Sequence, residues 1–304
     1  MSNYFQYSVC PVCGSSDFAE VLKAKDHSFS REEFAIVECG ACSFRFTQRP
    51  PDEASSEYYY GSEKYISHTE IKKGLINNLY HKVRKITLRV KARLVKNFTK
   101  KIIGHHLDIG AGTGAFVHEM EKASWNSIGI EPSQKARKIA HKLYKASVYP
   151  MTELNNLPED SYTAITMWHV LEHVYQLHDT LARIEKILDR DGALFIAVPN
   201  YQSFDAQFYG SNWAAYDVPR HLYHFTPASM KKLLDQHGLI LVKTRRMWFD
   251  SFYVSMLSEK YTKGFLLRGL IVGLVSNIIA LFNRNKCSSL LYVAKKVQLP
   301  EEDY

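Results

Sequence analysis

The sequence contains little cysteine and no apolar span that is both long and free of charge. Five cysteines among 304 residues are too few for a disulfide-stabilised scaffold. The first residues, Met1–Tyr7, have neither a basic start nor an apolar core, so a secretory signal is not expected. Internal repeats and low-complexity tracts are also absent, and 46% hydrophobic with 23% charged residues excludes general disorder. We therefore expect a folded cytoplasmic protein with one catalytic-size domain and a smaller module.

Acidic residues are missing from residues 71–101, where eleven Lys or Arg residues lie. The rest of the chain has 28 basic and 31 acidic residues, so the formal net charge of +8 originates in this one segment. Its apolar residues recur every three or four positions, which predicts a basic amphipathic helix, broken near Asn77–Asn78. These apolar positions are Leu75, Leu79, Val83, Ile86, Val90 and Leu94.

Four of the cysteines form two Cys-x-x-Cys turns, separated by 25 residues: Cys10, Cys13, Cys39 and Cys42. Two such turns supply four thiolates from opposite sides, as a structural zinc ion requires. Gly14 and Gly40 suit a tight path around the metal, because glycine tolerates positive φ. Two redox dithiols or two disulfides are the alternatives. Cys287 stands alone in an apolar context and is expected to be inert.

Between the two turns, the alternation of Phe18, Val21 and Leu22 and then of Phe34, Ile36 and Val37 predicts short strands and thus a ribbon. Arg49–Asp52 contains two prolines and marks a boundary. From His105 onward strands and helices alternate, which implies a mostly parallel sheet with helices on both faces. Expected strands are 105–109, 127–131, 163–168, 193–198, 239–246 and 289–296, and expected helices are 114–123, 133–144, 177–188 and 227–237. Thr226-Pro227 begins the last helix and Gly238 ends it, while Asp191-Gly192 forms a turn.

A glycine-rich loop follows the first of these strands and opens a helix. It contains Gly110, Gly112 and Gly114, with Asp108 two residues before the first glycine. Glu131 ends the next strand, 17 residues after Gly114. Such glycines let the backbone approach a ligand, and a carboxylate at the second strand's tip can hold ribose hydroxyls. Asp108 would repel a pyrophosphate, so this spacing favours a ligand with a cationic amino group.

These residues resemble class I methyltransferases that use S-adenosylmethionine. The resemblance continues through Leu157–Ile165, Met167–Val174, Leu188–Gly192 and Val198–Asn200. It implies that Asp108 and the glycines hold the methionine end, that Glu131 binds the ribose, and that Trp168 and His169 line the cofactor. Thr152 and Glu153 would lie near the adenine. Glu172-His173 fits either a packing role or a capping role.

With the cysteine turns in front, the sequence is similar to a bacterial subgroup that has an N-terminal zinc-binding region. Its catalytic domain is ubiquinone-biosynthesis-like or sugar C-methyltransferase-like, and the similarity covers most of residues 8–246 and the last strand. The resemblance implies an α/β fold with a Rossmann-like class I sheet, preceded by a zinc ribbon and a basic helix. The expected domains are 1–50, 51–101 and 102–304, with an apolar helical insertion over 250–286. Sugar C-methyltransferases continue into a further full domain that 304 residues cannot accommodate.

The acceptor should bind beyond the carboxyl ends of the strands, near the aromatic segment 201–225. His221 is the candidate general base, with ordering of this segment as its alternative role. His169 is the second catalytic candidate. Arg220 could engage an acidic acceptor, and Tyr65 and His68 could close the pocket.

The apolar run 265–282 carries one charge, Arg268, and lies between two strands of the expected sheet. A single membrane crossing there is impossible, so the run must be buried, pair with a second subunit, or lie at a membrane interface. The favoured function is methylation of an oxygen or carbon of a small metabolite, a sugar or a lipid-linked intermediate. An RNA methyltransferase is the alternative, although the strand-four exit lacks the Asn/Asp-Pro-Pro-aromatic signature. A non-catalytic protein that only binds the cofactor is the third.

Overall fold

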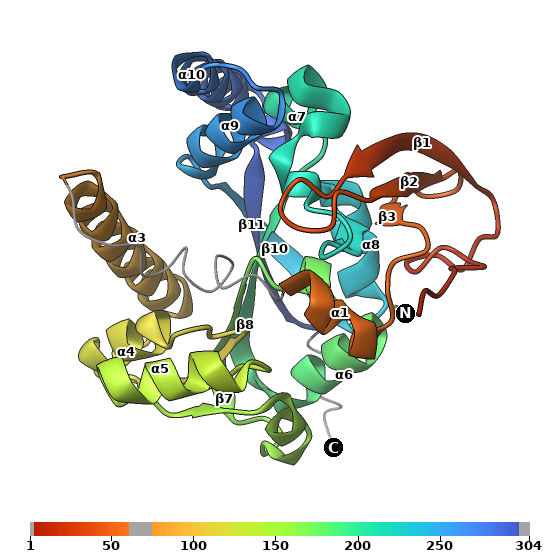
Figure 1. Cartoon of the computed structure of the whole chain (residues 1–304). Coiled ribbons are helices and arrows are strands. Elements are labelled where there is room, and N and C mark those ends of the chain that lie inside the picture. Colours follow the sequence, from red (N-terminus) through yellow and green to blue (C-terminus); the bar gives the residue numbers. More distant parts are fainter. Residues whose placement is uncertain (1–2, 61–74, 298–304) are drawn as a thin grey trace.

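The computed structural model describes the backbone of residues 3–60 and 75–297 (Figure 1). Tyr65 and His68, expected at the pocket, lie outside these residues. A seven-stranded sheet with the order β10-β11-β8-β7-β4-β5-β6 forms the centre. All of its strands are parallel except β11, which is antiparallel to both of its neighbours. The strands are β4 (His105–Ile109), β5 (Asn126–Ile130), β6 (Val148–Tyr149), β7 (Tyr162–Trp168), β8 (Leu188–Pro199), β10 (Leu239–Arg246) and β11 (Ser289–Lys296).

Helices cover both faces of this sheet, as the alternation of strands and helices predicted. Along β8, Leu194, Ile196 and Val198 point into one core, whereas Ala193, Phe195 and Ala197 point into the other. The first core is covered by α6 (Leu177–Ile187) and α8 (Pro227–Asp235). The second is covered by α3 (Leu75–Thr99) and α4 (Ala115–Lys122), and α5 (Gln134–Tyr144) packs beside α4. The chain thus has the Rossmann-like α/β fold that was expected.

The local signals around the sheet were mostly correct. Thr226 and Ser229 form a capping box at the start of α8, and Gly238 follows the helix with φ +66°. The turn expected at Asp191-Gly192 does not separate two elements. Instead β8 begins at Leu188, and residues 189–192 bulge out of its pairing with β7.

Helix α3 differs from its sequence pattern in two ways. The helix runs through Asn77–Asn78 without a break. Ile86 and Val90, placed on the expected buried stripe, are exposed, whereas Ala92 and Val95 are buried. The sheet beneath α3 supplies the reason, because the small Ala92 and Val95 allow close approach to Phe195 and Ala197. Packing against a specific surface therefore decided the helix face, over the amphipathic period.

The N-terminal module forms a second sheet, which the catalytic part of the chain completes. Its strands are β1 (Phe18–Lys25), β2 (Glu33–Cys39) and β3 (Arg45–Thr47), which fit the expected ribbon. A fourth strand, β9 (Tyr223–His224), pairs with β3 through Arg45↔His224 and Phe46↔Tyr223. The ribbon is followed by α1 (Glu53–Tyr60). Figure 1 shows the ribbon and α1 beside α6 and α8.

The aromatic segment 201–225 is largely buried and does not form an open lid. It contains α7 (Phe204–Tyr209), short 3-10 turns and β9. Trp213 is buried and donates its indole N–H to Asp205, over 2.8 Å. Among the large aromatic rings of this segment, Phe208 is half exposed. Most of the rings therefore pack with ribbon residues such as Phe34 and with Val254 and Val272 of the insertion over 250–286.

Arg220 joins this segment to the ribbon, which corrects its expected role in binding an acceptor. The guanidinium is 3% exposed and lies 3.0 Å from Asp26 and 2.6 Å from Asp217. It also donates to the carbonyl of Tyr59. Burial alone would raise the pKa of Asp26. The guanidinium of Arg220 instead holds this pKa below its ordinary value. A guanidinium already engaged by two carboxylates is a structural connection, not a free anion site.

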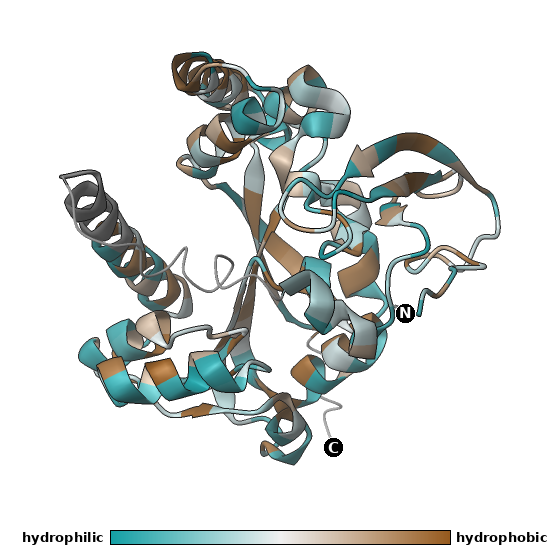
Figure 2. Ribbon diagram, viewed as in Figure 1, coloured by the Kyte–Doolittle hydropathy of each residue, from teal (hydrophilic) through white to brown (hydrophobic). Residues whose placement is uncertain are grey.

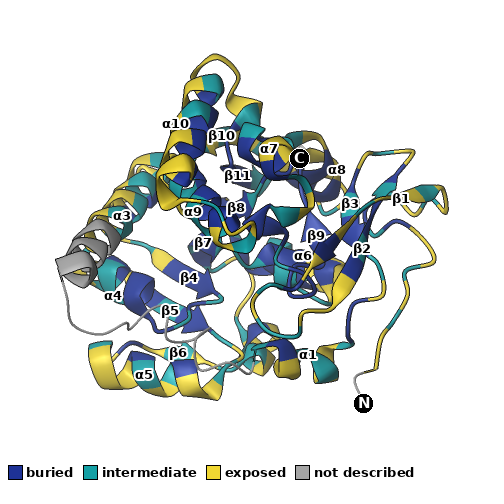
Figure 3. Cartoon of the chain, turned by 45° about the horizontal axis from the view of Figure 1, so that its top comes forward, coloured by how far each residue is buried: buried dark blue, intermediate teal, exposed yellow. Residues whose placement is uncertain are grey.

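A helical hairpin lies between β10 and β11. It consists of α9 (Asp250–Tyr261) and α10 (Leu266–Phe282), within the insertion expected over 250–286. None of the helices in the described part of the chain combines the length and apolarity that a membrane crossing needs. Burial of the whole apolar run was also an option, but nine of its large side chains are exposed (Figures 2 and 3).

Candidate functional site

The glycine loop lies at the carboxyl end of β4, between the strand and α4. Gly110, Gly112 and Gly114 all have positive φ, at 71°, 53° and 74°. A side chain at Gly110 would collide with Val170, and one at Gly114 with Ala140. At Gly112 an added Cβ would meet nothing within 4 Å. Two of the glycines are thus needed for packing, while the middle one leaves a surface on which a ligand can lie.

Asp108 is held by a chain of buried hydrogen bonds that the sequence did not reveal. Its carboxylate accepts a bond of 2.6 Å from the Thr166 hydroxyl. Thr166 in turn lies 2.9 Å from His106 Nε2, and His106 Nδ1 lies 2.7 Å from the Ser127 hydroxyl. Burial lowers the pKa of His106 to about 3, so its ring is neutral. With Nε2 protonated, the three bonds all run toward Asp108 and fix the carboxylate in place.

Asp108 is suited to a cationic partner. The residue is 3% exposed, and burial raises the pKa of its carboxyl to about 7, against the lowering effects of Thr166 and Lys91. Such a shift means that the charged form lacks solvation and gains from any cation brought close. The amino group of S-adenosylmethionine is such a cation, so the Asp108 carboxylate fits this ligand.

Glu131 follows β5 and closes the other side of the loop. One carboxylate oxygen accepts the Gly112 N–H and the other accepts the Ser133 N–H, both over 2.9 Å. Burial raises the pKa of Glu131, against these two hydrogen bonds. Each oxygen keeps a second lone pair, which ribose hydroxyls could use. The expected pairing of an acid with the glycine loop is therefore present in the fold.

Lys91 reaches the site from α3 and was not among the predicted site residues. Its ammonium lies 4.1 Å from the ring centre of Trp168. Burial lowers the pKa of Lys91, and the charges of Asp250 and Asp108 oppose that shift. One signal was available in the sequence. Lys91 is missing from the periodic basic face of residues 82, 85, 89, 93, 96 and 100.

His169 occupies the exit of β7 between two carboxylates. Its Nε2 lies 3.0 Å from Asp250 and its Nδ1 lies 3.5 Å from Glu172. Burial disfavours the charged ring, but these two partners raise the pKa of His169 to about 9. Its φ of +58° is unusual for a side chain with a Cβ and marks a constrained position. A ring that is charged at neutral pH donates hydrogen bonds and is a poor general base.

Glu172 lies at the centre of a histidine cluster, beyond the packing or capping role expected of it. It is fully buried, and neither carboxylate oxygen has a hydrogen-bond partner among the described residues. His221 Nε2 lies 4.0 Å from it, and the rings of His221 and His173 are 4.5 Å apart. Burial alone would raise the pKa of Glu172. The three nearby imidazoles outweigh this effect and lower the pKa: His169, His221 and His173.

The tautomers of the two neighbouring rings follow from their partners. His221 Nδ1 lies 2.8 Å from the carbonyl of Ala215, so it carries the proton there and leaves Nε2 toward Glu172. His173 Nδ1 lies 3.0 Å from the carbonyl of Arg220. Burial, with the nearby charge of His221, lowers the pKa of His173 to about 4. Of these two rings, His221 is therefore the one whose Nε2 faces the Glu172 carboxylate.

The structure brings most of the predicted site residues together. Asp108, the glycines and Glu131 surround one loop, while Trp168 and His169 continue from the neighbouring strand β7. His221 joins them through Glu172. Thr152 lies exposed in the 3-10 turn Met151–Asn156 after β6, and its role near an adenine stays a prediction. Asp250 was missed because it comes from the insertion, far along the sequence.

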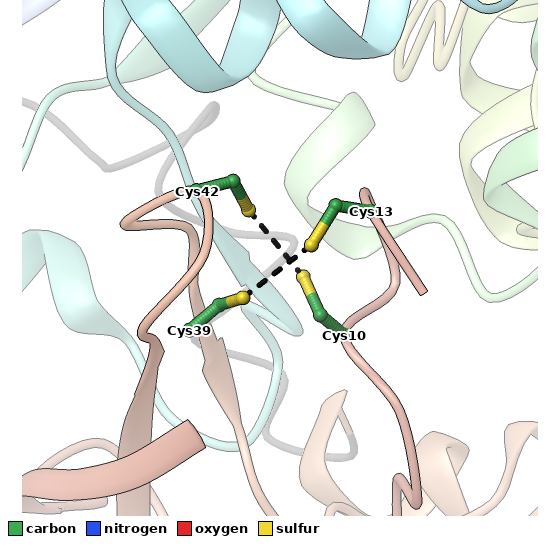
Figure 4. A group of neighbouring side chains, drawn as sticks. All are labelled: Cys10, Cys13, Cys39 and Cys42. Carbon is green, nitrogen blue, oxygen red and sulfur yellow. Dashed lines mark hydrogen bonds between the residues drawn. The ribbon is translucent and has the colours of Figure 1, made fainter. Parts of the chain in front are cut away.

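The four paired cysteines form a separate cluster at the end of the ribbon (Figure 4). Cys10 and Cys42 have their sulfurs 3.6 Å apart, and those of Cys13 and Cys39 are 3.4 Å apart. All four sulfurs lie within 4.8 Å of one another. Tetrahedral zinc with Zn–S bonds of about 2.3 Å requires sulfurs about 3.8 Å apart. The cluster therefore fits a four-thiolate metal site.

In one of the two cysteine turns, the residue with positive φ is not the glycine that was expected. Gly14 has φ +74° directly after Cys13, as predicted. In the second turn the matching left-handed residue is Ser43, with φ 53°, directly after Cys42. Gly40 does not have positive φ, and a Cβ there would require only the exposed Asp17 carboxylate to move.

Comparison with known proteins gives one domain match and several similar folds. The profile of a methyltransferase domain family matches residues 79–244. Ubiquinone biosynthesis O-methyltransferase from Bradyrhizobium diazoefficiens is 24% identical over 157 residues, which cover 48% of this chain and 62% of that enzyme. The chain therefore matches less than two thirds of that relative's length.

Two solved structures illustrate the similarity of fold. Phosphoethanolamine N-methyltransferase 2 from Haemonchus contortus, in complex with S-adenosyl-L-methionine, superposes with a TM-score of 0.53 at 14% identity. That match covers 92% of this chain and 69% of the other. A putative sarcosine dimethylglycine methyltransferase from Galdieria sulphuraria gives 0.51 at 13% identity, covering 81% and 100%.

We expect the purified protein to contain one zinc ion per chain, bound at the cysteine cluster. Cys10→Ser should remove most of the zinc and lower the melting temperature, because metal binding contributes directly to the folding of such sites. Cys287→Ser is the control, since Cys287 is buried and lies outside the cluster. Elemental analysis checks the prediction, and a wild-type protein that retains no metal after purification without chelators would contradict it.

The charged state of His169 should appear in the pH dependence of stability. Its folded pKa of about 9 lies above its ordinary value, so its stabilising contribution is complete below about pH 6.5 and is lost as the pH rises through 9. Asp250→Asn should lower the imidazole pKa and remove much of this dependence. Imidazole NMR titration and denaturant unfolding at several pH values measure both effects.

Asp235→Asn is the control for Asp250→Asn, because it removes an exposed carboxylate that is paired with Lys231, away from His169. It should leave the His169 titration unchanged. An imidazole that titrates near its ordinary pKa in the wild type would show that the two carboxylates do not hold its proton.

Proposed function

The chain belongs to the methyltransferase domain family, and on that premise we propose that it moves a methyl group from S-adenosylmethionine to an oxygen or carbon atom of a small or lipid-linked acceptor. The observation that carries this proposal is the arrangement around the glycine loop. A buried, poorly solvated carboxylate at Asp108, an open backbone surface at Gly112, and Glu131 lie together at the carboxyl ends of adjacent strands. Ligands of α/β sheets bind at this edge.

When bound, S-adenosylmethionine supplies an electrophilic methyl group on a positively charged sulfur. Asp108 would bind its amino group, and Glu131 would bind the ribose. Trp168 and His169, at the end of β7, would line the cofactor on the side of the acceptor. These assignments agree with the charges of the site, because a cationic ligand would enter beside carboxylates that already lack solvation.

His221 is proposed as the group that accepts the acceptor's proton. The carbonyl of Ala215 holds its Nδ1–H, so only Nε2 is available to take a proton. The imidazolium formed there would lie 4.0 Å from the Glu172 carboxylate, which would stabilise its charge. His169 is already charged at neutral pH, so we assign it a hydrogen-bonding role toward the reacting groups instead.

The weak similarity to a ubiquinone biosynthesis O-methyltransferase favours an oxygen acceptor on a small or lipid-linked molecule. The four cysteines would hold zinc in a structural role, since four thiolates fill the coordination sphere and leave no open position. RNA remains the competing acceptor, because α3 carries the basic residues that phosphates would attract.

Calorimetric titration should show S-adenosylmethionine binding by the wild type and its loss in Gly112→Arg, whose side chain would fill the open surface of the loop. Gly238→Arg is the matched control. Gly238 also has positive φ and open space around its Cβ position, but it lies beyond the C-terminal end of α8. If both variants bind like the wild type, the loop is not the cofactor site.

The acceptor class follows from incubation with methyl-labelled S-adenosylmethionine and cell extract, fractionated into lipids, small molecules and RNA. Label in the lipid or small-molecule fraction, absent with Gly112→Arg, supports the proposal. Label in RNA would establish the competing function. If S-adenosylmethionine binds but no fraction takes up label, the protein is a binding protein without transferase activity.

With the labelled fraction as acceptor, His221→Gln should lower kcat by about 100-fold or more, in the range expected for loss of a general base, without weakening cofactor binding. His224→Gln is the comparison, because His224 is also buried and contacts Thr47 within the same interface. Equal losses of kcat and of melting temperature in both variants would show that His221 only orders its segment. Loss of kcat with an unchanged melting temperature in His221→Gln alone would separate the chemical role from the ordering role.

A further inference from the structure

Helix α10 has its large apolar side chains on the outside. The outer face of α10 consists of residues that are each between 42% and 88% exposed: Phe265, Leu266, Leu267, Leu270, Ile271, Leu274, Ile278, Leu281 and Phe282. A surface helix of a globular protein normally has the opposite arrangement. Figure 2 shows the apolar colouring along α10, and Figure 3 shows exposed residues along the same helix.

The inner face of α10 is small or polar and fixes this orientation. A Cβ at Gly269 or Gly273 would lie 2.8 Å and 2.9 Å from the backbone of α9. Ser276 donates to Asp205, and Asn277 donates to the carbonyl of Trp248. Rotation of the helix to bury its leucines would break these bonds and force the two helices apart. The outer face is therefore a fixed property of the fold.

Positive charge lies at both ends of this apolar face. Residues 239–297 contain ten Lys or Arg and two acids, Asp250 and Glu259. Both acids are engaged, Asp250 by His169 and Glu259 by Arg268. Exposed cations flank both ends of α10, with Lys260 and Lys263 before it and Arg284 after it. Ten basic and two acidic residues give residues 239–297 a formal net charge of +8, beside +11 for residues 71–101, so the positive charge lies in two segments, not one.

The outward side of α3 repeats the same chemistry. Exposed Ile86 and Val90 alternate there with the exposed cations Lys85 and Arg93. Figures 1 and 3 both place α3 and the α9–α10 hairpin on the same flank of the molecule. The site reaches this flank too, since Lys91 of α3 contacts Trp168 and Asp250 of α9 contacts His169.

We propose that the outer face of α10 inserts into the surface of an anionic lipid membrane, with the cations around it and along α3 contacting the headgroups. Apolar side chains on one face, bordered by Lys and Arg without acids, are the features of helices that lie in the membrane interface. A second copy of the chain fits less well, because its matching face would bring the same positive charges together. The inference concerns binding to membranes and does not depend on methyl transfer.

Sedimentation of the full-length protein with vesicles tests the proposal. The vesicles consist either of phosphatidylcholine alone or of equal parts phosphatidylcholine and phosphatidylglycerol. The wild type should bind the anionic vesicles, and more weakly at high salt. Leu270→Ser/Leu274→Ser should reduce this binding at least about tenfold, because burial of the two leucines contributes much of the interfacial affinity.

Val21→Ser/Leu143→Ser is the matched control, since it removes two equally exposed apolar residues from β1 and α5. It should bind vesicles like the wild type. Thermal unfolding of both variants verifies that they are folded. Failure of the wild type to bind anionic vesicles, or equal binding by Leu270→Ser/Leu274→Ser, would overturn the proposal. A wild-type dimer that becomes monomeric in Leu270→Ser/Leu274→Ser would show that a second copy covers the face instead.

Discussion

A carboxylate that no solvent reaches must be compensated by the protein, and Glu172 imposes this constraint on the centre of the molecule. Three imidazoles approach it: His169 and His173 from its own turn after β7, and His221 from the segment before β9. Each ring has a second partner, namely Asp250, the carbonyl of Arg220 or the carbonyl of Ala215. Moving any one of these groups would leave a buried charge less well paired, which is costly in a low-dielectric interior. The α9–α10 hairpin, through Asp250, and the segment 201–225, through His221, are thus both coupled to one buried charge.

The ribbon is attached to this centre by equally buried contacts. Arg220, next to His221, pairs with Asp26 of the ribbon and Asp217 of its own segment. One residue later in the chain, the backbone of His221 accepts the Thr47 hydroxyl from β3. The cysteine cluster fixes the far end of the same ribbon. A metal that shapes the ribbon would therefore act on the candidate base through packed structure, although it lies in a different cluster.

The sequence predicted well those features whose cause is local. The three glycines, Asp108 and Glu131 were found because their spacing reflects a single turn between strand and helix, and Thr226-Pro227 because capping depends on neighbouring residues. The cysteine cluster was found because thiolate spacing carries the geometry of the metal. Lys91 and Asp250 could not be placed this way, since their roles depend on which face of α3 meets the sheet and where the hairpin docks. The role of Arg220 was misjudged, and the alternatives for the run 265–282 stayed open, for the same reason: chemical type alone does not indicate which side of a segment is covered.

The pairing of β3 with β9 has a consequence for how the protein is made. Phe46 leaves the ribosome long before Tyr223, its partner in the ribbon sheet. At typical synthesis rates the intervening chain takes on the order of ten seconds or more to appear. During that interval the ribbon exposes the unpaired edge of β3, and Asp26 lacks its guanidinium. The ribbon is thus synthesised before its partner strand β9 and is completed only after it, so a truncated chain that ends before residue 220 would carry an exposed strand edge and would leave Asp26 without its counterion.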